Sequence, residues 1–361
     1  MEETILKDIN PAEFIQLKNG VAIDVRSPIE FEEGSIPGAI NIPLFTNEER
    51  HEIGTLYKQQ GQDVARWRAM EIVSPKLPII LGELKRMKEQ GKEPVIHCWR
   101  GGMRSKSVAT FLEFAGIPAI RLDGGYRAYR QYILEELPHM LPEKAIVLHG
   151  MTGVGKTDIL LELEKKGYPI LDLEALANHR GSVFGSIGLD KAHNQKKFDA
   201  LLFHSLQKLQ ACHYFIMEAE SKRIGSVSQP EELLEKKIEG IHITIETSME
   251  QRVERIYKEY IVPFEKEEWF HENVVRAFER IEKRVKNEDL RNEIKEHLNN
   301  KSYKEIIEPL LTYYYDPRYE HKLLDYKGPF YEINVDNLGD AVHKLIRLIK
   351  NITEEKILGV H

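Results

Sequence analysis

PVIHCWRGGMRS, residues 94–105, is a short apolar segment that runs into a glycine-rich loop and then into a helix. Residues 94–97 are mostly apolar and favour a buried strand. The residues that follow have helical apolar spacing, which predicts Val108, Phe111 and Leu112 on one side of the helix. The stretch therefore predicts a strand, a tight loop and a helix, with a cysteine at the start of the loop.

The composition of this loop is typical of a site that activates a nucleophile. A Cys98 thiolate at a helix N-terminus is stabilised by unpaired backbone N–H groups and by the helix dipole. Arg100 and Arg104 add positive charge beside it, and the two glycines let successive N–H groups converge on one anion. A buried structural cysteine is the alternative, but two glycines and two arginines argue against an apolar pocket. Cys98, Arg100 and Arg104 are the candidate catalytic residues.

Composition limits the class of protein. The chain has 361 residues, enough for two or three domains, and 30% of them are charged, as in ordinary globular proteins. Its net charge is −7, so any RNA site must be a local basic patch. The chain has only two cysteines, which favours a reducing compartment. Because its N-terminus is acidic and it has no long apolar run, we expect a cytoplasmic protein without a membrane span.

Strands and helices alternate through the first half of the chain. Strands are predicted at 21–26, 40–43, 94–97 and 120–122, and helices are predicted to begin at Pro28 and to cover residues 79–91. This alternation predicts a parallel α/β sheet. The Cys98 loop would then lie at the carboxyl end of a strand, where such sheets place their sites.

Several separated motifs in this half resemble the rhodanese family. They are DVRSPIEF at 24–31, GSIPGAINIP at 34–43, the Cys98 loop and DGGY at 123–126. Ser35 departs from the histidine that this family often has in its scaffold motif. The resemblance implies a rhodanese-like domain over residues 1–137. The spacing from Cys98 to Arg104 also resembles the loop of cysteine-dependent phosphatases, so the loop leaves sulfur-group transfer and phosphate-ester cleavage both open.

The second half opens on a phosphate-binding motif. After a proline-containing linker at 138–144, an apolar strand leads into GMTGVGKT at 150–157 and then into a helix. A strand, a glycine-rich loop and a helix are the context that a P-loop requires, in which backbone N–H groups hold a di- or triphosphate. The candidate phosphate- or diphosphate-binding residues are Gly150, Thr152, Gly153, Gly155, Lys156 and Thr157, the last as a Mg²⁺ ligand. Residues 138–361 are predicted to form this P-loop domain, with a charged helical segment at about 250–325.

Acidic and basic side chains near two later strands are further candidates. Strands are predicted at 168–174 and 214–220, and carboxylates at their ends, Asp172, Glu218 and Glu220, could lie beside a metal or a phosphate. The candidate RNA contacts are Arg127, Arg180, Lys222 and Arg223. Solvated strand ends and surface turns are the alternative for each of these residues.

Taken together, the two halves resemble the family of tRNA 2-selenouridine synthases. The resemblance rests on the Cys98 loop, the P-loop, HRGS at 179–182, EAES at 218–221 and YYDP at 314–317. It implies a fold of two α/β domains: an N-terminal rhodanese-like parallel-sheet domain and a P-loop NTPase-like domain with a helical C-terminal part. It also implies a transferase that acts on tRNA with 2-thiouridine at the wobble position, with geranyl diphosphate and selenophosphate as co-substrates.

The implied reaction has two stages. The sulfur of 2-thiouridine is first geranylated, and selenium from selenophosphate then displaces the S-geranyl group to leave 2-selenouridine. We expect Cys98 to accept selenium as a perselenide-type intermediate, Arg104 to be the charge partner of the phosphate, and the P-loop to hold the geranyl donor's diphosphate. A nucleoside triphosphate is the rival ligand of the P-loop.

Two other classes of function stay open at the level of sequence. The first is a cysteine-dependent phosphatase or sulfurtransferase with a nucleotide-binding regulatory domain. The second is a P-loop kinase in which the rhodanese-like domain is a binding module. The first would act on small phosphate esters or thiosulfate without RNA, and the second would consume ATP without needing Cys98.

Overall fold

The computed structural model describes residues 6–320, 326–335 and 337–357 of the chain. The end of the predicted helical segment, residues 321–325, lies outside them. The chain divides into two compact units, one of residues 1–137 with 196–203 and one of residues 138–195 with 204–361. Each unit is built on a parallel sheet of its own, as the alternation of strands and helices predicts.

The first unit contains five parallel strands in the order β1-β5-β4-β2-β3. The strands are β1 (Lys7–Ile9), β2 (Gly20–Asp24), β3 (Ile40–Asn41), β4 (Glu93–His97) and β5 (Ile120–Leu122). Its helices are α1 (Pro11–Gln16), α2 (Pro28–Glu32), α3 (Asn47–Gln60), α4 (Gln62–Val73), α5 (Leu77–Glu89), α6 (Met103–Phe114) and α7 (Gly125–Glu136). The central strand β4 leads directly into the Cys98 loop, so the sheet positions that loop.

Side chains from β4 and α6 form much of the core of this unit. Ile96, Val108 and Leu112 are buried in one apolar cluster together with Cys98. Phe111, predicted on the same side of α6, is instead 41% exposed. The buried face of α6 runs through Ser105, Val108, Ala109 and Leu112, which is the i, i+3, i+4, i+7 pattern, and Phe111 lies outside that stripe.

The second unit has five parallel strands in the order β12-β11-β6-β8-β7, and a two-stranded antiparallel hairpin of β9 and β10. The strands are β6 (Lys144–His149), β7 (Ile170–Leu171), β8 (Tyr214–Glu218), β9 (Arg223–Ile224), β10 (Val227–Ser228), β11 (Ile241–Glu246) and β12 (Phe330–Asn334). Its helices are α8 (Lys156–Lys165), α9 (Leu173–Ala177), α11 (Glu231–Glu239), α12 (Met249–Ile256), α13 (Glu268–Glu279), α14 (Glu288–Asn299), α15 (Ile307–Leu310), α16 (Asp316–Glu320) and α17 (Leu338–Ile357). Helix α10 (Gln195–Leu209) is divided between the units, with residues 196–203 in the first. The P-loop follows β6 at the centre of this sheet.

One predicted strand of this unit is much shorter in the structure. Residues 168–174 were expected to form a strand, but β7 covers only Ile170–Leu171. Asp172 ends the strand because its side chain accepts a hydrogen bond from the N–H of Ala175 and so caps α9. Glu174 therefore lies in the first turn of a helix.

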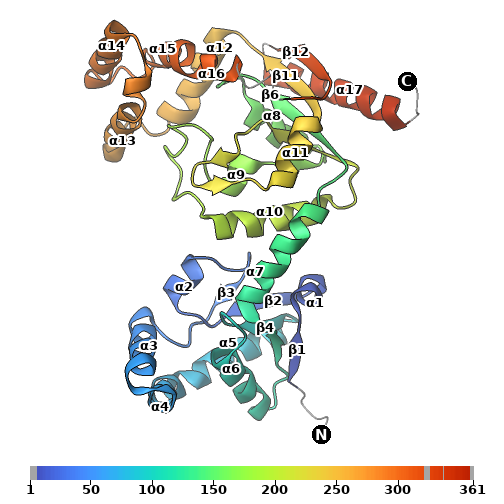
Figure 1. Ribbon diagram of the computed structural model, residues 1–361, viewed down its shortest axis with the longest axis vertical. Coiled ribbons are helices and arrows are strands. Elements are labelled where there is room, and N and C mark those ends of the chain that lie inside the picture. Colours follow the sequence, from blue (N-terminus) through green and yellow to red (C-terminus); the bar gives the residue numbers. More distant parts are fainter. Residues whose placement is uncertain (1–5, 321–325, 336, 358–361) are drawn as a thin grey trace. The chain divides into compact units, whose positions relative to one another are not determined.

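The second unit has two separate apolar cores. One lies between the sheet and helices α8 and α17, with residues such as Leu148, Leu160 and Leu345. The other is made by the helices from α12 to α15, which Figure 1 shows in orange beside the sheet. Two π-helical segments, Tyr257–Ile261 and Leu311–Tyr315, belong to this helical part. None of the described helices is long and apolar enough to cross a membrane.

Candidate functional site

The loop that carries Cys98 rests on the turn that follows β5. The N–H of Tyr126 donates to the Cys98 carbonyl and the N–H of Arg127 donates to the Trp99 carbonyl, both at 2.9 Å. Gly125 has a φ of 61°, and a Cβ there would collide with the Cys98 carbonyl oxygen. The turn at 123–126 therefore needs glycine so that Gly125 and Cys98, 27 positions apart (125 − 98), can pack backbone to backbone.

The Cys98 sulfur is buried beside a hydroxyl group. Cys98 is 3% exposed, and its Sγ lies 3.4 Å from Oγ of Ser105. Ser105 Oγ also lies 3.2 Å from the Gly102 carbonyl, to which it donates. When the thiol ionises, this hydroxyl can turn its hydrogen toward the sulfur, and charged acceptors strengthen such bonds. The sequence analysis did not name Ser105 as a candidate. Its only signal in the sequence is its position seven residues after the cysteine.

Replacing Ser105 with alanine is expected to slow the reaction of Cys98 with iodoacetamide by about tenfold, since a hydrogen bond to a charged group is worth about 1.5 kcal/mol or more. The rate is measured in a Cys212→Ser background, which leaves Cys98 as the single thiol. Ser107→Ala is the matched control because Ser107 Oγ, on the same helix, donates to the Met103 carbonyl instead. Equal rates for Ser105→Ala and Ser107→Ala would contradict the role of Ser105.

A buried ion pair fixes the strand next to the loop. The guanidinium of Arg26 donates to both carboxylate oxygens of Asp24 and to the Gly34 carbonyl, and it lies 4.4 Å from the ring centre of Tyr126. Arg26 and Asp24 are both almost fully buried. Burial lowers the pKa of the neighbouring His97, which keeps that imidazole neutral. These residues build the scaffold of the loop, as the sequence motif at 24–31 indicates.

The structure places the two candidate arginines of the loop differently. Arg104, in the first turn of α6, donates to both carboxylate oxygens of Glu30 at 2.6 and 3.2 Å. This pairing lowers the pKa of Glu30 against the opposing effect of its burial. Arg100 is exposed at the loop surface. An anion over Cys98 would have to share Arg104 with Glu30, and the roles of both arginines stay predictions.

The P-loop is held from outside by α12. Arg252 Nε donates to the Thr152 carbonyl at 2.9 Å, and Arg255 Nη1 donates to the Gly153 carbonyl at 2.6 Å. Gly153 has a φ of 85°, and a Cβ there would lie 2.8 Å from Cδ1 of Ile256. These two bonds hold the backbone of Thr152 and Gly153 against α12, so the helix fixes the shape of the loop. The sequence analysis did not assign this anchoring role to α12.

The last two residues of the motif, Lys156 and Thr157, carry its side-chain chemistry, and both have close partners. Lys156 Nζ lies 3.0 Å from the Gly150 carbonyl. Thr157 Oγ1 lies 2.9 Å from Oε1 of Glu218 and 3.4 Å from Oε2 of Glu174. The end of β8 and the start of α9 thus bring carboxylates to the P-loop threonine.

Three carboxylates gather at this position. Glu174, Glu218 and Glu220 each offer an oxygen atom, and these atoms lie within 4.8 Å of one another. Burial, with repulsion from the other carboxylates of the group, raises the pKa of Glu174 and of Glu218, while Lys156 opposes the shift. Hard oxygen donors beside a P-loop threonine fit a Mg²⁺ ion, and the ion would relieve the repulsion.

The sequence analysis predicted only part of this carboxylate group. Glu218 and Glu220 were named as candidates, and they belong to the group. Asp172 was named as a rival, but it caps α9 and is not among the three residues. Glu174 was missed because the predicted strand over 168–174 hid the helical turn that directs this side chain toward Thr157.

The four candidate RNA contacts differ in what surrounds them. Arg127 and Arg223 are exposed. Lys222 forms an ion pair with Glu231. Arg180 forms an ion pair with Glu259 at 3.0 Å and lies 4.7 Å from the ring centre of Tyr260, so it helps to hold its own loop. Arg127 and Arg223 are therefore the better placed of the four to meet a phosphate.

Two family models match the chain, and together they cover most of it. Residues 10–132 match the model described as a rhodanese-like domain, and residues 143–346 match the one described as the tRNA 2-selenouridine synthase AAA domain. Residues 133–142, which lie between the two matches, overlap part of the predicted linker at 138–144.

Relatives that match along most of their length carry one name. The chain is 33% identical over 339 residues to a tRNA 2-selenouridine synthase of Sulfurovum sp. (strain NBC37-1), which covers 86% of this chain and 90% of the relative. It is 34% identical over 348 residues to a tRNA 2-selenouridine synthase of Hydrogenovibrio crunogenus, and this match covers 88% of this chain and 95% of the relative. A crystal structure titled as the N-terminal domain of a putative ATP/GTP binding protein from Clostridium difficile 630 is 40% identical, covering 35% of this chain and 98% of that one with a TM-score of 0.34.

Proposed function

The chain belongs to the tRNA 2-selenouridine synthase family, and from this premise we propose that it is a tRNA-modifying enzyme that converts wobble 2-thiouridine to 2-selenouridine in two steps. One observation supports two steps above all. The chain carries both a cysteine loop suited to a phosphorus-containing anion and a P-loop, each on a sheet of its own. A single displacement would not need both.

The first step is transfer of a geranyl group. The sulfur of 2-thiouridine attacks C1 of geranyl diphosphate, a C–S bond forms, and the C–O bond breaks with its electron pair going to the departing diphosphate. The P-loop N–H groups and Lys156 are suited to bind that diphosphate and to stabilise the charge it gains as it leaves. Thr157, Glu174, Glu218 and Glu220 would hold a Mg²⁺ ion, which neutralises diphosphate charge when bound.

The second step delivers selenium. Selenium displaces the S-geranyl group at C2 of the base, so that a C–Se bond forms and geranylthiol leaves. The Cys98 loop is suited to hold the phosphoryl group of selenophosphate, through the backbone N–H groups at the start of α6. The buried sulfur and the Ser105 hydroxyl lie at the base of this loop.

Electron balance favours a different intermediate from the perselenide expected above. If the Cys98 thiolate attacked selenium, the Se–P electron pair would remain on phosphorus, and phosphite would leave in place of phosphate. Attack on phosphorus is redox-neutral: an S–P bond forms, the Se–P bond breaks, and selenium leaves as selenide with the electron pair. Water then cleaves the S–P bond, which releases phosphate and restores the thiolate.

Donor omission tests the two-step proposal. Purified protein is incubated with 2-thiouridine-containing tRNA, and its nucleosides are analysed by mass spectrometry. Geranyl diphosphate alone should yield the S-geranyl nucleoside, selenophosphate alone should leave 2-thiouridine unchanged, and both together should yield 2-selenouridine. Release of phosphate from small esters, or consumption of ATP, with no change in the tRNA would instead favour the phosphatase or kinase alternative.

Binding of tRNA to this acidic chain must depend on local cations, since the net charge is −7. We expect the affinity to fall at least about tenfold between 50 and 200 mM salt, because each released counterion contributes to the slope. Arg223→Ala should reduce the slope of log K against log salt by about 1, and Lys222→Ala by less because Lys222 is already paired with Glu231. Filter binding across a salt series measures both, and a flat salt response would contradict the prediction.

A further inference from the structure

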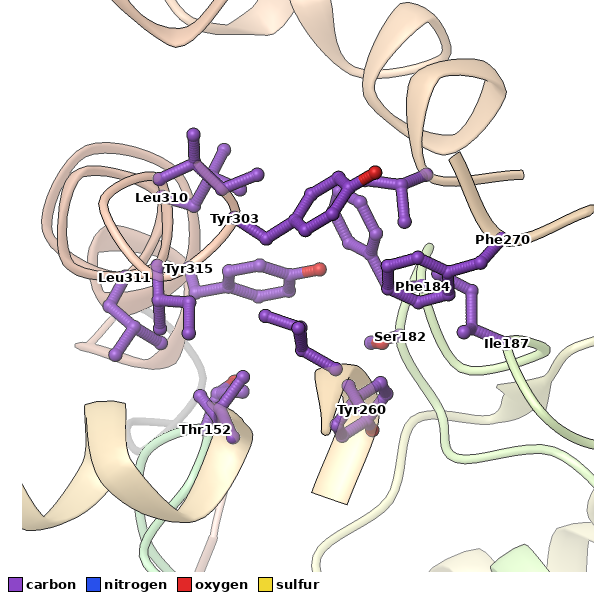
Figure 2. Close-up of a pocket in the computed structure, with 15 residues that line it drawn as sticks. Thr152, Ser182, Phe184, Ile187, Tyr260, Phe270, Tyr303, Leu310, Leu311 and Tyr315 are labelled. Carbon is purple, nitrogen blue, oxygen red and sulfur yellow. The ribbon is translucent and has the colours of Figure 1, made fainter. Parts of the chain in front are cut away.

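A largely apolar cavity lies beside the P-loop, inside the second unit. It encloses about 600 Å³ of space free of protein atoms, its open mouth included. Thr152 of the P-loop lines one side of it, and Figure 2 shows Tyr303 and Phe270 on the side opposite Thr152. A ligand whose phosphates lie on the P-loop therefore has an apolar space next to its other end.

The lining of this cavity is unlike a site for a nucleobase. Ten of its fifteen lining residues are aliphatic or phenylalanine side chains, and the other five offer hydroxyl groups; no charged, amide or imidazole side chain lines it. The edges of a base need several donors and acceptors in the plane of the ring. A hydrocarbon chain needs apolar surface, which this lining supplies.

Unusual backbone conformation is concentrated around the same cavity. The two π-helical segments Tyr257–Ile261 and Leu311–Tyr315 both contribute to its wall, the first through Tyr260 and Ile261 and the second through Leu311 and Tyr315. The Tyr315 ring points into the space between Thr152 and Tyr303 (Figure 2). π-Helical turns are rare and are found mostly at functional sites. Because both π-helical segments line this cavity, we infer that the cavity is a functional feature and not a packing defect of the helical core.

Two contacts support Tyr303 on the side of the cavity opposite Thr152. Tyr303 packs edge-on against Phe270 with ring centres 5.0 Å apart, and its hydroxyl lies 3.1 Å from Nδ1 of His271. Phe270 and Val274 lie one helical turn apart on α13 and both face the cavity. These contacts hold the Tyr303 ring in the wall opposite Thr152, where it would meet the end of a chain that enters past Thr152.

We propose that this cavity binds the hydrocarbon chain of a prenyl diphosphate whose head lies in the P-loop, and that Phe270, Val274 and Tyr303 limit the length of that chain. The inference rests on the proposed function, which places the diphosphate on the P-loop. It adds where the chain lies, and which side chains separate a ten-carbon from a longer donor. It also predicts that this P-loop prefers a prenyl diphosphate to a nucleotide.

Isothermal titration of the full chain tests the cavity without tRNA. Geranyl diphosphate should bind at least about 30-fold more tightly than inorganic pyrophosphate, since each buried methylene favours binding by roughly a factor of four. Val274→Trp should remove this difference and leave pyrophosphate binding unchanged. Val262→Trp is the matched control because Val262 is 49% exposed and does not line the cavity. If Val274→Trp loses pyrophosphate binding as well, Ile307→Phe from another wall replaces it with the same expectation.

Chain length is tested by prenyl transfer to tRNA. Tyr303→Ala should raise the ratio of farnesyl to geranyl transfer at least about tenfold. Equal affinity of the wild type for pyrophosphate and geranyl diphosphate, tighter binding of ATP, or an unchanged ratio in Tyr303→Ala would overturn the inference. Geranylation by the wild type despite any of these results would leave the proposed function standing, whereas absence of any prenyl transfer would reject the proposed function itself.

Discussion

Cys98→Ser is expected to stop selenium transfer and to leave S-geranyl tRNA as the accumulated product. The serine hydroxyl is not ionised near neutral pH and does not replace a thiolate that attacks phosphorus. We expect formation of 2-selenouridine to fall at least about a thousandfold, as when a nucleophile is removed from other enzymes. Geranylation should continue, because we propose that it takes place at the P-loop of the other unit. Nucleoside mass spectrometry after a fixed time measures both products.

The matched control for this variant is Cys212→Ser, which removes the other free thiol of the chain. Cys212 follows α10 in the second unit and lies in neither loop, so its replacement should leave both products unchanged. Full formation of 2-selenouridine by Cys98→Ser would show that selenium reaches the base without this thiol. The account of the Cys98 loop would then be wrong.

Lys156→Ala should have the complementary effect. The lysine is the one cation within the P-loop motif, and removing it takes away charge stabilisation of the departing diphosphate. We expect geranyl transfer to fall at least about a hundredfold, an effect typical of losing one group that stabilises developing charge. Lys165→Ala is the control, since Lys165 lies on the same helix but is exposed and paired with Glu162. Unchanged geranylation in Lys156→Ala would remove the P-loop from the first step.

Attack on phosphorus and attack on selenium leave different covalent intermediates on Cys98. Attack on phosphorus forms an S-phosphoryl cysteine, which adds a phosphoryl group to Cys98 and no selenium. Rapid acid quench followed by intact-mass analysis separates the two intermediates by mass. A selenium adduct on Cys98 would contradict attack on phosphorus. Cys98 would still be the nucleophile, but its target would be selenium.

Local patterns predicted much of the fold. An apolar strand, a glycine-containing loop and an amphipathic helix recur around Cys98 and around Lys156, and the structure contains both units on parallel sheets. These patterns succeed because strand burial and helix periodicity are encoded within about a dozen neighbouring residues. The prediction of a strand over 168–174 was wrong for a local reason too, because Asp172 caps α9 and ends the strand despite the apolar run before it.

Apart from Ser105, which contacts Cys98 seven positions away, the missed parts of the site depend on contacts between residues distant in sequence. Arg104 is paired with Glu30 from 74 positions earlier, which no spacing in the Cys98 loop reveals. Glu174 reaches Thr157 only because α9 begins where it does. The apolar cavity is assembled from the P-loop, a loop near Phe184 and several helices, so its walls have no common motif. Such features follow from tertiary packing and become visible only in the folded chain.

The most direct test of the two-site account supplies the intermediate from outside. Purified tRNA that already carries S-geranyl-2-thiouridine is given with selenophosphate to Lys156→Ala and to Cys98→Ser, and 2-selenouridine is measured over time. If each site serves one step, Lys156→Ala should form 2-selenouridine at the wild-type rate and Cys98→Ser should form none. Failure of folded Lys156→Ala on this substrate, or normal turnover by Cys98→Ser, would contradict the assignment of the two steps to the two loops.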